Sequence, residues 1–141
     1  MTAPIIEISD HANPDAERVL GSGLAAFNEG VTGYNDRLPL TVLIKDPETR
    51  QVIGGITGKT TLGMAFLDLF HVPATLRGTG LGSRLLQAFE DEARRRGCLN
   101  AVLYTISFQA PGFYEKNGWV RFGEIPCAPE GSSRVFMSKR L

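Results

Sequence analysis

Apolar positions recur at helical spacing near the start of the chain. A helix is predicted from Pro14 to about Asn28, because Asn13 is a good N-cap and proline is favoured at the first helical position. The apolar residues of this helix are Val19, Leu20, Leu24 and Phe27. Before it, weak alternation over Ile5–Ser9 predicts an edge strand, and the glycines and prolines of Glu29–Pro39 predict a loop.

The rest of the chain is dominated by short apolar and β-branched runs that predict strands. Leu62–Val72 is apolar almost throughout, which is typical of a central strand that is buried on both faces. The other strand predictions are Leu40–Lys45 and Gln51–Ile56 as a hairpin, Leu99–Phe108, and Trp119–Phe122 with Arg134–Lys139 as a late antiparallel pair.

A second helix is predicted over Gly80–Arg96, between two of these strands. Its apolar face is formed by Leu81, Leu85, Ala88, Phe89 and Ala93, and its charged residues, Glu90 among them, are expected on the other faces. The last turn holds three arginines, 94 to 96, which we interpret as a solvated face that complements the helix dipole. Strand, helix and strand form a βαβ unit, so Leu62–Val72 and Leu99–Phe108 are expected to be parallel with their carboxyl ends together. A short helix is predicted to begin at Pro111 and to end at Gly118.

Composition limits the class of protein. The 141 residues fit one domain, 1–141, and 15 basic residues balance 15 acidic ones, which argues against a dedicated nucleic-acid or membrane binder. The first residues lack the pattern of a signal peptide, so a cytoplasmic protein is expected. Cys98 and Cys127 are far apart and have no metal-ligand spacing, so we expect no metal site.

The strongest chemical signal is the glycine-rich junction between the central strand and the second helix. Gly78, Gly80 and Gly82 allow a ligand to approach the backbone closely, and the first turn of the helix offers unpaired N–H groups. Arg77 adds a cation suited to phosphate oxygens, so this junction is predicted to bind a phosphate or pyrophosphate. It is not a dinucleotide fingerprint, because Ser83 stands where the third glycine would be. A second glycine-rich run, Gly54–Thr60, resembles a P-loop but is one residue short.

Two blocks together resemble the GNAT superfamily of N-acetyltransferases. The first is V-P-A-T-L-R-G-T-G-L-G-S-R-L-L, in which Arg77, Gly80 and Gly82 match the family's pyrophosphate motif. The second is F-Q-A-P-G-F-Y-E-K-N-G-W, which resembles the segment carrying the family's tyrosine, here Tyr114. The resemblance implies a single-domain α/β GNAT fold: a mixed, twisted sheet of about six to seven strands flanked by helices. It also implies a splay between Leu62–Val72 and Leu99–Phe108.

The resemblance further implies that acetyl-CoA is the co-substrate and that the acetyl group passes directly to an amine. Tyr114 is then the expected general acid, which protonates the departing sulfur. The expected cofactor-binding residues are Phe70 and Val72 by their backbone groups, Arg77, Gly78, Gly80, Gly82 and Ser83.

Several questions stay open at the level of sequence. The general base is His71, Asp68 or water alone, and a regular strand would place the two side chains on opposite faces unless a bulge lies between them. Phe27, Asn28 and Tyr34 are the candidates for binding a small-molecule or peptide amine. The alternative function is a non-catalytic acyl-CoA-binding module. A homodimer is expected, with the apolar last strand as a candidate edge, and neither the acceptor nor the use of longer acyl groups is determined.

Overall fold

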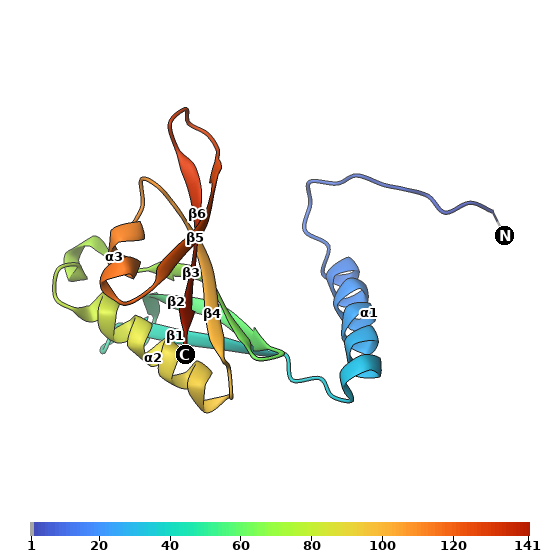
Figure 1. Ribbon diagram of the computed structural model, residues 1–141, viewed down its shortest axis with the longest axis horizontal. Helices are drawn as coiled ribbons and strands as arrows, with labels where there is room; N and C mark the ends of the chain where they lie inside the picture. Colours follow the sequence, from blue (N-terminus) through green and yellow to red (C-terminus); the bar gives the residue numbers. More distant parts are fainter. Residues whose placement is uncertain (1) are drawn as a thin grey trace. The chain divides into compact units, whose positions relative to one another are not determined.

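A computed structural model describes residues 2–141 of the chain (Figure 1). The described chain divides into two compact units, a smaller one that ends at Asn35 and a larger one, Asp36–Leu141. Each unit is described by itself. None of the helices that the model describes is both long and apolar enough to cross a membrane.

The smaller unit is built on one helix, α1, which spans Pro14–Thr32. The predicted start is confirmed, since the Asn13 side chain accepts a hydrogen bond of 2.9 Å from the Ala16 N–H. The predicted end at Asn28 is wrong by one turn, because the helix continues to a left-handed cap at Gly33, whose φ is 83°. The edge strand predicted at Ile5–Ser9 is also wrong: residues 5 to 9 form no strand, and alternation alone cannot stabilise one where residues 2–35 contain no other strand to pair with.

The larger unit contains a six-stranded mixed sheet in the order β1-β2-β3-β4-β6-β5. The strand bounds are β1 Leu38–Lys45, β2 Val52–Thr61, β3 Met64–His71, β4 Asn100–Ile106, β5 Val120–Pro126 and β6 Ser133–Arg140. The predicted mixed α/β class and strand number are confirmed, and β3 is interior as expected. The last strand is not an edge, because β6 pairs with β4 on one side and β5 on the other.

One face of this sheet carries the core. Helix α2, Leu81–Arg95, lies along that face (Figure 1), and its buried residues include Leu85, Leu86 and Phe89. The inward positions of β4 and β6 follow the period of two, with Ala101, Leu103, Val135 and Met137 all buried. Two shorter helical segments complete the unit, a 3-10 turn η1 at Ala74–Leu76 and helix α3 at Pro111–Lys116.

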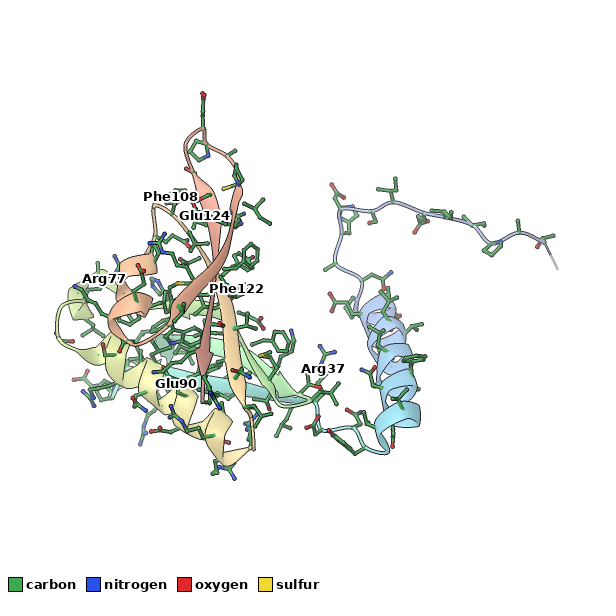
Figure 2. The ribbon with its side chains drawn as sticks, viewed as in Figure 1. Arg37, Arg77, Glu90, Phe108, Phe122 and Glu124 are labelled. Atoms are coloured by element: carbon green, nitrogen blue, oxygen red, sulfur yellow. The ribbon has the colours of Figure 1, made fainter. Side chains whose placement is uncertain are left out.

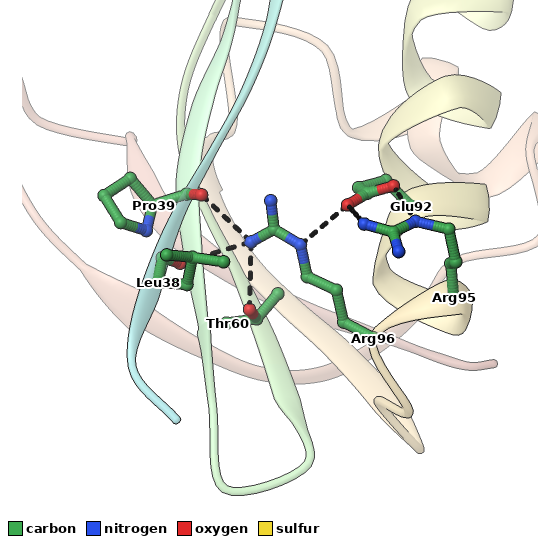
Figure 3. Close-up of polar contacts among 6 residues, drawn as sticks. All are labelled: Leu38, Pro39, Thr60, Glu92, Arg95 and Arg96. Atoms are coloured by element: carbon green, nitrogen blue, oxygen red, sulfur yellow. Dashed lines mark hydrogen bonds and ion pairs between the residues drawn. The ribbon is translucent and has the colours of Figure 1, made fainter. Parts of the chain in front are cut away.

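The end of α2 is clamped to the sheet by Arg96 (Figure 3). Its Nε donates to Glu92 over 2.8 Å, and one terminal nitrogen donates to the carbonyl of Pro39 at 2.9 Å and the hydroxyl of Thr60 at 3.1 Å. The predicted solvated face is therefore wrong for Arg96, whose side chain is 18% exposed, although Arg95 is 72% exposed. Spacing along a helix could not reveal this contact, because its acceptors lie on strands far away in sequence.

Candidate active site

The central opening of the sheet lies between β3 and β4. Their parallel pairing covers only three pairs, from Met64 with Asn100 to Phe66 with Val102. Beyond these pairs β3 continues to His71 and β4 continues to Ile106, each paired on its other side. The two strands thus separate toward their carboxyl ends, which is the splay expected from the sequence, and the unpaired edge of β3 can accept an added strand-like ligand.

The predicted anion-binding corner lies at the carboxyl end of β3, where η1 leads into α2. Gly80 is the N-cap of α2 with a φ of 82°, and no side chain caps this helix start. Gly78 also has a positive φ of 77°, so both glycines hold a conformation that other residues resist. The first-turn N–H groups of α2, including those of Gly82 and Ser83, are therefore open to an anion, and the helix dipole favours negative charge there.

Arg77 precedes these glycines and is exposed at the turn into α2 (Figure 2). Its Nε donates to the carbonyl of Val72 over 2.9 Å. This bond ties the guanidinium to the end of β3 and directs it beside the glycines, where its terminal nitrogens suit a phosphate. Because of this bond, the Val72 carbonyl already accepts a hydrogen bond from Arg77.

Aromatic side chains connect the end of β3 with α3. The Phe70 ring contacts Phe113, with centroids 5.7 Å apart, and Tyr114, with centroids 6.2 Å apart. A Cβ added to Gly82 would lie 3.4 Å from the Phe113 ring, so this glycine lets α3 pack closely against the first turn of α2. The structure thus brings Phe70, Gly82 and Tyr114 together from three elements, as the sequence predicted.

Tyr114 is buried, with 7% of its surface exposed. Burial raises the pKa of its phenol from 10.0 to about 12. The hydroxyl therefore keeps its proton throughout the neutral range, so it can donate a hydrogen bond or a proton. That is the state which a departing thiolate requires.

A bulge in β3 changes the relation between the two candidate bases. Thr57 of β2 is opposite Leu69, whereas the next residue, Gly58, is opposite Leu67, so Asp68 is the extra residue. Asp68 and His71 are therefore not forced onto opposite faces. The Asp68 carboxylate lies 3.9 Å from Lys59 Nζ, while His71 is exposed at the end of the strand.

The three candidate acceptor residues belong to the smaller unit. Phe27 is 72% exposed and Tyr34 is 50% exposed. Asn28 lies on α1, and its backbone carbonyl accepts a hydrogen bond of 2.8 Å from the Thr32 hydroxyl. Because each unit is described by itself, the role of these residues stays a prediction.

The P-loop-like run, Gly54–Thr60, lies within strand β2. A Cβ on Gly55 would lie 2.2 Å from the Val42 carbonyl oxygen, and one on Gly58 would lie 2.1 Å from that of Phe66. These glycines therefore permit close approach of neighbouring strands and form no phosphate-binding loop.

Glu90 is the main residue that the sequence analysis misplaced. It was expected on a charged face of α2, but it is 1% exposed, and its Oε2 accepts a hydrogen bond of 3.2 Å from the Trp119 indole. The signal was present in the spacing, since Leu86, Glu90 and Ala93 follow the period of the buried face. A carboxylate on that face indicates a specific polar partner, which sequence alone does not name.

Comparisons with known proteins point to one family, the GNAT acetyltransferases. The acetyltransferase (GNAT) family matches residues 7–119. The acetyltransferase Atu2258 of Agrobacterium fabrum is 33% identical over 134 residues, which cover 95% of this chain and 97% of that protein. The blasticidin-S acetyltransferase of Streptomyces morookaense is 38% identical over 95 residues, covering 67% of this chain and 70% of that protein.

Solved structures agree with the fold. A crystal structure of a protein from Agrobacterium tumefaciens has a TM-score of 0.87 and 32% identity, covering 98% of this chain and 100% of that chain. A Bacillus anthracis protein, solved in complex with acetyl coenzyme A, has a TM-score of 0.60 and 22% identity, covering 82% of this chain and 68% of that chain.

Proposed function

Because the chain belongs to the acetyltransferase (GNAT) family, we propose that it transfers an acetyl group from acetyl-CoA directly to a primary amine of a small molecule or peptide. The observation that carries the proposal is the meeting of three elements at the splay. The open edge of β3, the uncapped start of α2 and the buried Tyr114 of α3 lie around one corner. They suit, in turn, a pantetheine arm, a pyrophosphate and a leaving sulfur.

Binding of acetyl-CoA begins at the glycine corner in this proposal. The pyrophosphate accepts hydrogen bonds from first-turn N–H groups of α2 at Gly82 and Ser83, and the terminal nitrogens of Arg77 pair with its charge. The pantetheine arm lies along the open edge of β3, near the backbone groups of Phe70 and the N–H of Val72, which follows the strand and whose carbonyl already accepts from Arg77. A Bacillus anthracis protein of the same fold binds acetyl coenzyme A, which supports this assignment.

Transfer follows from attack of a neutral amine on the thioester carbonyl. The carbon–nitrogen bond forms and the carbon–sulfur bond breaks, with the electron pair passing to sulfur. Tyr114 donates its proton to that sulfur, and the amine proton passes to a base. We assign the base to His71, because it is the exposed last residue of β3 beside the glycine corner, whereas Asp68 lies earlier in the strand with its carboxylate 3.9 Å from Lys59 Nζ.

A direct transfer needs no acyl-enzyme, and the two cysteines support this. Cys98 lines a cavity of about 210 Å³ with Asp36 and Arg96, beyond the carboxyl end of α2. Because α2 has 15 residues, this end lies about 22 Å from the glycine corner. Burial also raises the pKa of the Cys98 thiol, which disfavours the nucleophilic thiolate. Cys127 lies half-buried after β5.

A relative is named a blasticidin-S acetyltransferase, so blasticidin-S, simple polyamines and peptides form the first acceptor panel. The test follows release of the CoA thiol from acetyl-CoA with and without each amine. We expect release that depends on one class of amine and an acetylated product of matching mass. Tight acetyl-CoA binding without amine-dependent release would instead support the non-catalytic module.

A further inference from the structure

Glu90 is a buried acidic residue of α2 in the larger unit (Figure 2). Its Oε1 lies 2.6 Å from Lys139 Nζ and 3.6 Å from a terminal nitrogen of Arg94. Its Oε2 accepts from the indole of Trp119. The carboxylate of α2 thereby contacts β6 and the chain that leaves α3.

These contacts converge on the end of α3. Lys139 Nζ donates to the carbonyl of Asn117 over 2.7 Å, and the Asn117 side chain donates to the carbonyl of Phe113 over 2.9 Å. The backbone N–H of Trp119 donates to the carbonyl of Tyr114 over 3.0 Å. The rings of Trp119 and Tyr114 also contact each other, with centroids 6.1 Å apart. Lys139 and Trp119, which contact Glu90, thus also take part in the contacts that fix the end of α3 and Tyr114.

Stability alone does not account for a carboxylate at this position. Burying an ion pair costs desolvation energy, and well-packed apolar residues of similar volume are often at least as stabilising. A six-residue helix such as α3 has few hydrogen bonds of its own, so its orientation depends on what anchors its end. A buried hydrogen bond with one allowed direction can supply that anchor.

We propose that Glu90 is a positioning residue, which fixes Trp119 and, through it, the Tyr114 hydroxyl at the splay. This inference rests on the proposed function, in which Tyr114 acts on the thioester. It links α2, whose first turn binds the pyrophosphate, to the helix that carries the acid. A displaced Tyr114 slows the chemical step while the pyrophosphate contacts are unchanged.

Two double variants test the inference, Glu90→Met with Lys139→Met and Glu90→Gln with Lys139→Met. Neither leaves an unpaired buried charge, and only the glutamine pair keeps at residue 90 an oxygen that can accept from the Trp119 indole. We expect kcat of the methionine pair to be lower than that of the glutamine pair by on the order of tenfold. We expect the KM for acetyl-CoA to be the same in both. Equal kcat values in the two folded variants would overturn the inference.

Trp119 is the one tryptophan of the chain, so its fluorescence reports this anchor without any turnover. The emission maximum is expected to differ between the two double variants, and identical emission counts against the anchor. The single variant Trp119→Phe removes the donor and decides the matter if the methionine pair does not fold. We expect its kcat to fall by on the order of tenfold relative to the wild type, and an unchanged kcat overturns the inference.

Glu92→Gln is the matched control, because Glu92 lies on the same helix and pairs with Arg95 and Arg96 rather than with Trp119. Its kcat is expected to equal that of the wild type. A wild-type enzyme without amine-dependent release would overturn the proposed function instead. The Trp119 emission of the double variants would then decide alone whether Glu90 anchors the end of α3.

Discussion

At the scale of single residues, the phenol of Tyr114 is the group whose environment is most specific. Because its pKa is raised to about 12, it would still hold its proton when the thioester breaks down in the proposed reaction, and phenylalanine lacks only this hydroxyl group. We expect Tyr114→Phe to lower kcat by roughly a hundredfold, the usual size of general acid catalysis, with acetyl-CoA binding unchanged. Steady-state kinetics combined with acetyl-CoA titration measures both. Undiminished turnover in the folded variant would exclude this role.

The raised pKa of Tyr114 also determines how the stability of the fold and the reaction rate should depend on pH. Tyr114 stays protonated in the folded protein up to about pH 12, while in the unfolded chain it ionises near 10.0, so its burial begins to disfavour the native state only above pH 10. The rate should therefore rise from neutral toward alkaline pH as the amine substrate loses its proton. No falling limb is expected from Tyr114 below about pH 11.

A matched pair of substitutions distinguishes between the two candidate bases, His71 and Asp68. If His71 accepts the amine proton, His71→Gln lowers kcat/KM at neutral pH by on the order of tenfold or more, and the loss shrinks at high pH, where the amine is already neutral. Asp68→Asn is expected to have a much smaller effect, since Lys59 already engages that carboxylate. Measured pH–rate profiles of both variants decide the assignment. A larger effect of Asp68→Asn than of His71→Gln would identify Asp68 as the base. If both variants keep the pH–rate profile of the wild type, water accepts the proton.

At the scale of elements, the Arg96 clamp is where a helix end depends on distant strands. Replacing Arg96 with methionine leaves the carbonyl of Pro39 and the hydroxyl of Thr60 without their donor. We expect the free energy of unfolding to fall by about 2 kcal/mol, which urea denaturation measures. Arg95→Met is the control, because that exposed side chain also pairs with Glu92 but is expected to change stability much less, since solvent screens an exposed ion pair. Equal losses in the two variants would contradict the clamp.

Glu92 adds an acid dependence to this helix end. Hydrogen bonds from Arg95 first and Arg96 second lower the pKa of Glu92 from 4.5 to about 2. A lowered carboxyl pKa stabilises the folded state at pH values above 4.5, and that contribution is lost as the pH falls toward 2. Acid unfolding of Glu92→Gln is therefore expected to depend less on pH across this interval.

The elements themselves could be predicted to different degrees. The βαβ unit followed from periodicity and from the glycine-rich junction that precedes α2, so β3, α2 and β4 were placed within a few residues. Single-strand patterns carry no information about partners, which explains the false strand at Ile5–Ser9 and the expectation that β6 lies at an edge. The bulge at Asp68 was equally hidden, because it is defined by the register against β2.

At the scale of the whole molecule, the position of the glycine corner could be predicted from the sequence, whereas an acceptor side could not. Arg77, Gly80, Gly82 and Tyr114 form local motifs, and each motif determines its own backbone chemistry. An acceptor site is instead assembled from side chains on distant segments, and its specificity depends on their relative placement. The polar anchor at Glu90 belongs to the same class, since its partners are 29 and 49 residues away along the chain.

Oligomeric state is the remaining property at this scale, and the apolar stripe of α1 is a candidate interface for the expected homodimer. The stripe follows helical spacing and consists of Leu20, Leu24, Phe27 and Val31. A helix of this length gains most of its stability from packing an apolar face, and we expect a second copy of the chain to contribute to that packing. Light scattering on the eluting protein should give twice the monomer mass of 15.3 kDa. Leu24→Asp should halve that mass, whereas Glu17→Gln, a polar change on the same helix, should not. A wild-type protein of monomer mass would exclude the dimer. A dimer that persists in Leu24→Asp would show that its interface does not involve this face of α1.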